Sequence, residues 1–243
     1  MPPRLRIFAG PNGSGKTTLA SWLAKDYAVN LYHFINADML FAEVSLSHRL
    51  PCPFEINASQ LLAFVRASTF TEEQKQFFLS GAIRLEDEFL IFEPSAINSY
   101  TVAMLAEFYH SEYLARGASF SLETVFSHTS KLDLLKHAKE QGYRTYLYFI
   151  ATDSPDISVA RVSTRVRQGG HDVPIDKILT RYTRSLHNAT LALPLVNRAY
   201  FFDNSGEHIT LVAEATDQTW QMVAPRLPKW FCKHFEPLLT LHG

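Results

Sequence analysis

The chain has 243 residues, and 23 lysines and arginines nearly balance 24 aspartates and glutamates, for a formal net charge of −1. This balance excludes general electrostatic attraction to nucleic acids or acidic lipids, so any anion-binding site must be local. Hydrophobic residues make up 47% of the chain and aromatic residues 13%, a composition that supports a buried core and excludes a disordered protein.

The two cysteines, Cys52 and Cys232, cannot form a disulfide framework and have no neighbours at metal-ligand spacing. They are typical of reduced thiols, with a single bridge as the alternative. The first residues lack the apolar run of a signal peptide, and no window reaches the roughly 18 apolar residues of a membrane helix. We therefore expect a cytoplasmic protein with no membrane partner.

Short apolar runs alternate with helical patterns along most of the chain. The predicted strands are Leu5–Ala9, Leu31–Ile35, Phe120–Leu122, Tyr143–Ile150 and Ala199–Phe202, the last of the core strands. The predicted helices are Thr17–Tyr27, Lys131–Gln141, a helix that begins at Pro155, and Pro174–Leu191. This alternation predicts an α/β fold with a mostly parallel central sheet flanked by helices, in a single domain over residues 1–243.

Residues 42–117 do not follow this alternation, because one crossover helix needs far fewer residues. Glu72–Phe92 and Val102–Arg116 are predicted helices, so the segment is interpreted as a helical insertion after the second strand. It adds packing or forms a wall of the substrate pocket. Residues 207–243 are interpreted as a packed C-terminal element without an assigned function.

The sequence from Gly10 to Thr17 matches the pattern GxxxxGK(S/T) between a predicted strand and a predicted helix. In this motif backbone N–H groups surround a phosphate, the lysine reaches the β and γ phosphates, and the Ser/Thr hydroxyl binds Mg²⁺. Lys16 and Thr17 would have these two roles with ATP and Mg²⁺ as cofactors. The predicted nucleotide-binding residues are Gly10, Pro11, Asn12, Gly13, Ser14, Gly15, Lys16, Thr17 and Thr18.

Other features narrow the class of P-loop protein. The chain has no NKxD element, which a GTPase would use to specify guanine, and no long apolar strand that ends in Asp-Glu, as in motor or transporter ATPases. The size and the short strands favour a small-molecule kinase, in which a second pocket holds the acceptor hydroxyl beside the γ-phosphate.

Two carboxylates follow predicted strands. Asp38 comes after the second strand, where it could be the general base for the acceptor hydroxyl, or merely the N-cap of the next helix. Glu123 ends the Phe120–Leu122 strand and could hold an acceptor hydroxyl or a metal-bound water, or face solvent.

A basic cluster lies between the predicted strands Tyr143–Ile150 and Ala199–Phe202. Its members are Arg161, Arg165, Arg167, Gly169, Gly170, His171 and Arg181. Arg161 and Arg165 share a helix face, and the glycine pair supplies a hinge. Mobile arginines of this kind can neutralise charge on the transferring phosphoryl group and exclude water. The alternative is a basic surface.

These motifs resemble the zeta-toxin family of P-loop kinases. The matching stretches are Phe8–Thr18, Ile35–Asp38, Phe120–Thr124, Gly142–Tyr143, Arg161–Arg165, Gly169–Pro174, Arg181–Tyr182 and Asp203–Ser205. The resemblance implies a shikimate-kinase-like fold and ATP-dependent 3′-phosphorylation of the aminosugar of UDP-N-acetylglucosamine. It also implies Asp38 as the base, Glu123 with Thr124 at the substrate, and Arg165 and Arg181 as phosphate-clamping arginines.

The chain departs from the family pattern near the expected acceptor site. Val125 follows Glu123-Thr124, where the family often continues with Thr, and Asn36-Ala37-Asp38 replaces the frequent Asn-Pro-Asp. The acceptor could therefore be another nucleotide sugar, a nucleoside, a dinucleotide or a polynucleotide end, although the neutral charge disfavours a polynucleotide. A regulatory module that binds ATP without transfer is the further alternative. Any neutralising antitoxin would be a separate chain.

Overall fold

The computed structural model describes residues 1–168, 173–216 and 219–239. The chain divides into two compact units. The first, which we call the sheet unit, comprises residues 1–34 and 117–243, and the second, the insert unit, comprises residues 35–116. None of the described helices combines the length and apolar character needed to cross a membrane.

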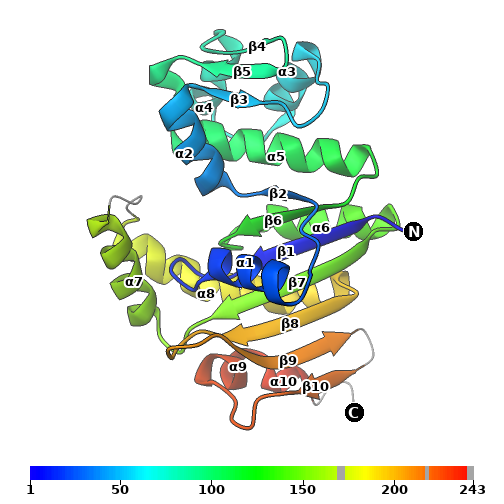
Figure 1. Ribbon diagram of the computed structural model, residues 1–243, viewed down its shortest axis with the longest axis vertical. Coiled ribbons are helices and arrows are strands. Elements are labelled where there is room, and N and C mark those ends of the chain that lie inside the picture. The colour runs from blue at the N-terminus through cyan, green and yellow to red at the C-terminus, as the bar shows by residue number, and fades with distance from the viewer. Residues whose placement is uncertain (169–172, 217–218, 240–243) are drawn as a thin grey trace. The chain divides into compact units, whose positions relative to one another are not determined.

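The central sheet has seven strands in the order β10-β9-β8-β7-β1-β6-β2. Their bounds are β1 Arg4–Ala9, β2 His33–Ile35, β6 Phe120–Thr124, β7 Arg144–Ala151, β8 Arg198–Asp203, β9 Thr210–Thr216 and β10 Trp220–Met222. β1 lies between β6 and β7 and is parallel to both, and β8 is parallel to β7. The predicted mostly parallel sheet is confirmed (Figure 1).

Helices pack on both faces of this sheet (Figure 1). Their bounds are α1 Lys16–Asp26, α6 Ser130–Glu140, α7 Pro155–Arg167, α8 Ile175–Ala192, the short helix η2 Leu193–Leu195, α9 Lys229–His234 and α10 Glu236–Leu239. α7 begins where predicted because the Ser154 side chain accepts a hydrogen bond from the Asp156 N–H, with Pro155 as the first helical residue. The predicted helices of this unit are confirmed to within one or two residues.

The prediction that Ala199–Phe202 is the last core strand is wrong. β9 and β10 follow it and add two antiparallel strands to the sheet. The chain then forms α9, whose aromatic side chains pack against β7 and β8. The Phe149 ring of β7 lies 5.9 Å from the ring of Trp230, and the Phe201 ring of β8 lies 5.4 Å from that of Phe231. The C-terminal residues therefore complete the core of the sheet unit.

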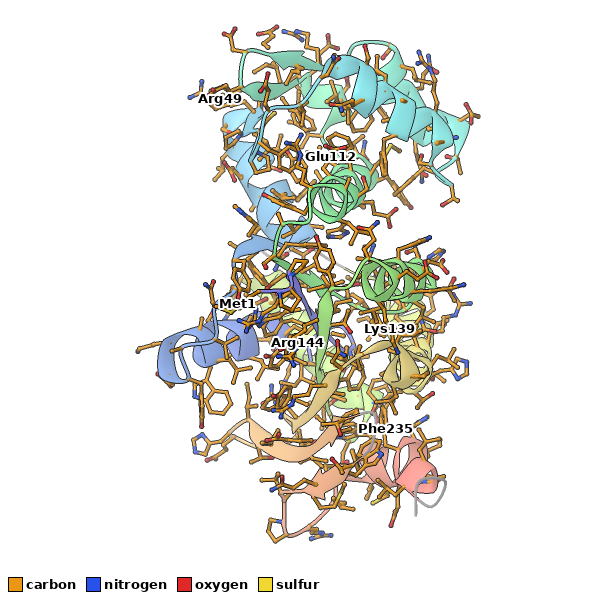
Figure 2. The ribbon with its side chains drawn as sticks, turned by 90° about the vertical axis from the view of Figure 1, so that its right-hand side faces the viewer. Met1, Arg49, Glu112, Lys139, Arg144 and Phe235 are labelled. Carbon is orange, nitrogen blue, oxygen red and sulfur yellow. The ribbon has the colours of Figure 1, made fainter. Side chains whose placement is uncertain are left out.

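The insert unit contains helices and a small antiparallel sheet. Its elements are α2 Ala37–Ser47, β3 Arg49–Pro51, α3 Ala58–Ala67, α4 Glu72–Leu79, β4 Ile83–Glu86, β5 Phe89–Phe92, η1 Pro94–Ala96 and α5 Ser99–Ala115. The sheet order is β3-β5-β4. Figure 2 labels Arg49 on β3 and Glu112 on α5.

The predicted helix Glu72–Phe92 is therefore wrong beyond Leu79. Gly81 adopts φ 84°, a left-handed conformation that ends the helical run. Asp87 adopts φ 51° in the turn between β4 and β5, so the apolar residues of Ile83–Phe92 form a hairpin. The Val102–Arg116 prediction is confirmed as α5, which begins three residues earlier.

Cys52 and Cys232 are both free thiols, as the sequence predicts, so the alternative of a single bridge is wrong. Burial raises the pKa of Cys52 to about 11, so this thiol stays protonated at neutral pH. A protonated thiol is a poor nucleophile and a poor metal ligand. The structure thus gives Cys52 no catalytic character.

Candidate nucleotide site

The glycine-rich loop joins β1 to α1 and is tightly packed at its first glycine. A Cβ atom at Gly10 would lie 2.0 Å from the Ile150 carbonyl oxygen, so no side chain fits there. Gly15 adopts φ 97° directly before α1, a conformation that favours glycine. These constraints hold the loop backbone against β7 and leave the N-terminus of α1 uncovered by a capping side chain.

The loop presents polar groups that suit an anion. Lys16 is 8% exposed, and its Nζ donates a hydrogen bond to the Pro11 carbonyl at 3.0 Å. The Asn12 side-chain oxygen and the Ser14 hydroxyl are buried and have no hydrogen-bond partner among the described residues. The first turn of α1 contains no acidic residue. The Lys16 ammonium, the Ser14 hydroxyl and the backbone N–H groups at the start of α1 can donate to a phosphate, whereas the Asn12 oxygen can only accept.

Thr17 and Glu123 meet at this loop. The Thr17 hydroxyl donates a hydrogen bond to Glu123 Oε2 at 2.8 Å. The contact follows from the sheet: β6 lies beside β1, with Glu123 in register with Phe8. Glu123 is half-buried, so the alternative that it only faces solvent is wrong.

The paired hydroxyl and carboxylate fit a magnesium ion. Mg²⁺ prefers oxygen ligands and is commonly held by one or two protein groups, with waters and substrate phosphates as its other ligands. Among the described residues no group of three or more histidine, cysteine or acidic side chains could hold a metal. A small donor set beside a phosphate-binding loop is therefore the arrangement that suits this ion.

Thr124, the other residue predicted at the substrate, ends β6 and makes a local contact. Its hydroxyl accepts a hydrogen bond from the Phe126 N–H at 3.1 Å. Phe126 adopts φ 62°, so the hydroxyl stabilises a turn at this point. A substrate role for Thr124 stays a prediction.

The arginines of α7 differ in how they lie. A Cβ atom built on Gly13 would be 3.4 Å from the Cβ of Arg161, so the first side-chain atom of Arg161 lies beside the loop. Arg161 Nη1 is buried and has no hydrogen-bond partner among the described residues. Arg165, one turn later, is half-buried, whereas Arg167 is exposed and donates to Thr164 Oγ1 at 3.1 Å. Arg161 and Arg165 are therefore better placed than Arg167.

Arg181 is half-buried on α8, which packs against α7 through Val162, Val173 and Ile178. The Tyr182 hydroxyl donates a hydrogen bond to the Thr152 carbonyl at the end of β7. This contact fixes α8 beside the strand that supports the loop. The predicted hinge and donor residues Gly169, Gly170 and His171 lie outside the described residues.

Asp38 belongs to the insert unit, where it is exposed in the first turn of α2. The N-cap of this helix is Asn36, whose side-chain oxygen accepts the N–H groups of Asp38 and Met39 at 2.8 and 3.3 Å. The alternative that Asp38 serves as the N-cap is therefore wrong. Its role as a base stays a prediction.

Asn204 supports the loop, although the sequence analysis gave it no role. Its side-chain Nδ2 donates to the Ser14 carbonyl at 2.8 Å, and a Cβ at Gly15 would lie 2.5 Å from the same atom. The Asn204 N–H donates to the Ala151 carbonyl at 2.9 Å, which ties it to β7. The sequence signal is a run of polar residues at the end of a core strand, Asp203-Asn204-Ser205.

Replacing Asn204 by aspartate should raise KM for ATP by about fivefold. The carboxylate has the same size but cannot donate to the Ser14 carbonyl, and one hydrogen bond contributes about 1 kcal/mol. Glu207→Ala, an exposed residue on the same connection, is the matched control. Steady-state kinetics check the prediction, and equal KM values for the two variants would contradict it.

Comparison with known proteins gives one sequence relative. No family model matches the chain. The relative, an uncharacterised protein of Haemophilus influenzae, is 35% identical over 63 residues, which are 26% of this chain. The chain spans 45% of the length of this curated relative.

Solved structures share the fold. A chain in the crystal structure of the AvrRxo1-ORF1:-ORF2 complex with ATP matches this chain with a TM-score of 0.55 at 17% sequence identity. The match covers 99% of this chain and 66% of the chain in the complex. A structure from the PezAT chromosomal toxin–antitoxin system of Streptococcus pneumoniae matches 96% of this chain and 78% of its own, with a TM-score of 0.51 at 15% identity. The chain therefore shares the fold of these structures, an α/β fold with a seven-stranded, mostly parallel central sheet flanked by helices.

Proposed function

We propose that the chain is an ATP-dependent phosphotransferase that transfers the γ-phosphate to a hydroxyl of a small molecule. The observation that carries this proposal is the hydrogen bond from Thr17 to Glu123 beside Lys16. It unites a hydroxyl, a carboxylate and an ammonium group at the end of a phosphate-binding loop. Phosphoryl transfer needs positioning and charge stabilisation, and these groups can supply both.

The loop and α1 bind the triphosphate. The backbone N–H groups before α1 surround the phosphates, and the Lys16 ammonium exchanges the Pro11 carbonyl for phosphate oxygens. Thr17 and Glu123 would hold Mg²⁺, which when bound supplies positive charge at the phosphate oxygens. Asn204 holds the Ser14 carbonyl and so keeps the loop in place during binding.

The arginines of α7 and α8 act on the transferring group. The Cβ atom of Arg161 lies beside Gly13, and Arg165 is one turn further along the same face of α7. With Arg181 they can donate to the phosphoryl oxygens as negative charge moves and exclude water from the site. We assign the clamp to Arg165 and Arg181. Arg161 is a further member, because its Nη1 is buried and has no hydrogen-bond partner among the described residues.

Asp38 is the proposed general base, which takes the proton of the acceptor hydroxyl. Because Asn36 caps α2, the Asp38 carboxylate is not needed to satisfy the first N–H groups of the helix. The resemblance to zeta toxins favours UDP-N-acetylglucosamine or a related nucleotide sugar as the acceptor. A separate antitoxin is the proposed protein partner, in parallel with the toxin–antitoxin system to which the PezAT structure belongs.

Transfer from radiolabelled ATP to defined acceptors tests the proposal. The purified chain is incubated with UDP-N-acetylglucosamine, with a nucleoside, with a dinucleotide or with a 5′-hydroxyl oligonucleotide. We expect label on the nucleotide sugar. Label on another acceptor would correct the substrate but retain the kinase, whereas ATP binding without transfer to any of them would favour the regulatory alternative.

Replacing Asp38 by asparagine should lower kcat by at least about 10²-fold, the lower end of the contribution of a general base. Asparagine has the same size but cannot take a proton. ATP binding should persist because the residues that bind the triphosphate belong to the sheet unit. Rapid-quench kinetics at saturating ATP, together with calorimetry of ATP binding, check both statements.

The control for this variant is Glu43→Gln, an exposed residue of the same helix. Its kcat should stay within about twofold of wild type. If Asp38→Asn keeps full activity, the base lies elsewhere, and Glu123 is the next carboxylate to test.

A further inference from the structure

Three parallel strands of the sheet unit begin with an arginine: Arg4 on β1, Arg144 on β7 and Arg198 on β8. Arg4 is in register with Arg144, and Arg6 is in register with Tyr146, which is itself in register with Arg198. Residues in register, and residues two apart on one strand, point to the same side of a sheet. The four arginines therefore share one face.

Tyrosines lie among these arginines. We call the group the arginine–tyrosine face: Arg4, Arg6, Arg144, Arg198, Tyr32, Tyr146 and Tyr200. The Arg4 guanidinium donates to the Tyr32 hydroxyl at 3.0 Å, and that of Arg198 donates to the Tyr200 hydroxyl at 3.2 Å. The hydrogen bond from Arg4 lowers the pKa of Tyr32, which reflects the positive potential at this face.

The positive charge of this face is only partly offset within the described part of the chain. None of the four arginines forms an ion pair with a described residue. Arg4 and Arg144 are like charges in register, an arrangement that destabilises a sheet. Glu214, in register with Tyr200, attracts Arg198 electrostatically but forms no ion pair with it. A chain with net charge −1 thus places four arginines on one face, where the Glu214 carboxylate offsets part of their charge.

Arg6 is a second, independent observation. It is 8% exposed, and its Nε and Nη1 have no hydrogen-bond partner among the described residues. Its guanidinium lies over the rings of Tyr32 and Tyr146, at 4.9 and 5.3 Å from their centroids. Burying a cation with unpaired N–H groups costs free energy that an anion brought to this face would offset.

The rings at this face are already engaged. Phe8 stacks on Tyr148 at 4.8 Å, and Tyr148 stacks on Tyr200 at 5.0 Å, while Tyr32 and Tyr146 pack against Arg6. Bases of a single-stranded nucleic acid bind by stacking on open ring faces. The face instead presents guanidinium N–H groups, which suit carboxylates.

We propose that the arginine–tyrosine face binds an acidic segment of another protein chain. Neighbouring strands are about 4.8 Å apart, and Arg4 and Arg6 are about 7 Å apart along β1. Carboxylates on successive turns of a helix are separated by about 5–6 Å, so an acidic helix can reach several of these arginines at once.

The face lies at the amino ends of the strands, whereas the glycine-rich loop follows the carboxyl end of β1, about 16 Å away along the strand. Figure 1 shows α1 and this loop at one end of β1 and the chain N-terminus at the other. Figure 2 looks toward the amino ends and labels Arg144, whose N–H bonds the Pro3 carbonyl. A partner docked here leaves the nucleotide loop open.

A fluorescein-labelled helical peptide with glutamates at positions i, i+3, i+4 and i+7 tests the proposal by fluorescence anisotropy. We expect saturable binding that weakens as salt rises. The double variant Arg144→Glu, Arg198→Glu should weaken binding by at least about tenfold, because both residues are exposed at the face. ATP binding should be unchanged.

The matched control is Arg66→Glu, Arg184→Glu, which makes the same change in net charge at exposed arginines elsewhere. It should keep the affinity for the peptide within about twofold. If circular dichroism shows that the Arg144→Glu, Arg198→Glu variant does not fold, the double variant Arg144→Gln, Arg198→Gln is tested in its place. Glutamine removes the positive charge without adding a negative one.

Three results would each overturn the proposal. If the two double variants lose the same affinity for the peptide, the loss comes from the change in net charge and not from the arginine–tyrosine face. Tighter binding of single-stranded oligothymidylate, lost in the face variant, would assign the face to nucleic acid. A concentration-dependent dimer that the face variant abolishes would make the occupant a second copy of this chain.

Discussion

Replacing Lys16 by alanine should abolish measurable phosphoryl transfer. The ammonium is buried at the loop, and in the structure it donates to the Pro11 carbonyl, a contact that phosphate oxygens would replace. Loss of this charge removes stabilisation from the β and γ phosphates in the transition state, where electrostatic groups contribute most. The measurement is transfer of label from ATP at saturating acceptor.

The fold should survive this change. The hydrogen bond from Lys16 Nζ to the Pro11 carbonyl is worth about 1 kcal/mol, and the lysine side chain is not part of the apolar core. Lys25→Ala, an exposed residue of the same helix, is the matched control and should retain wild-type transfer and thermal stability. A Lys16→Ala variant with wild-type turnover would refute the nucleotide site.

The sheet unit could be predicted from the sequence because its signals are local. Glycines, prolines and capping residues bound its elements: Pro155 opens α7, and Gly142, with φ 77°, follows α6. What the local pattern could not supply was β9 and β10, since an antiparallel pair after the last parallel strand depends on what covers it.

The insert unit was harder because its turn residues are unusual. Asp87 and His48, with φ 51° and 56°, adopt left-handed conformations, which Asp and His enter more often than most residues but for which glycine is the stronger sequence signal. Without a turn signal at Asp87, the residues from Ile83 to Phe92 continue a helical pattern instead of forming a hairpin. Apolar periodicity alone does not separate short strands from helix segments.

The candidate site was predictable where one motif contains it, and less so where distant segments meet. The loop from Gly10 to Thr17 carries its own chemistry in sequence. The contact between Thr17 and Glu123 depends on the pairing of β6 with β1, and that between Asn204 and Ser14 on the position of β8. Strand-end polar residues are the signal that such contacts leave in a sequence.

The same reasoning separates the two groups of arginines. Arg161 and Arg165 lie on a helix beside the phosphate loop, after the carboxyl end of β7, where ligands of parallel sheets bind. Arg4, Arg144 and Arg198 begin strands at the opposite edge. The arginines beside the loop can stabilise charge during phosphoryl transfer. The arginines at the amino ends of the strands would instead bind a partner chain, so their replacement should leave kcat unchanged.

Alanine at Arg165 or at Arg181 should lower kcat by roughly 10²–10⁴-fold, the loss expected when preorganised electrostatic stabilisation of the transition state is removed. KM for ATP should change much less, because ground-state binding rests on the loop and α1. The control is Arg167→Ala on α7, whose exposed side chain donates to Thr164. It should keep kcat within about twofold of wild type.

Arg161→Ala extends this experiment to the arginine nearest the loop. Its Cβ would lie 3.4 Å from a Cβ on Gly13, and its Nη1 is buried without a partner among the described residues. If Arg161 shares the clamp, its loss should lower kcat as strongly as the loss of Arg165. Near-normal kcat in all three variants would instead make α7 and α8 a basic surface, and stabilisation of the transferring charge would then depend on Lys16 alone among the cations considered.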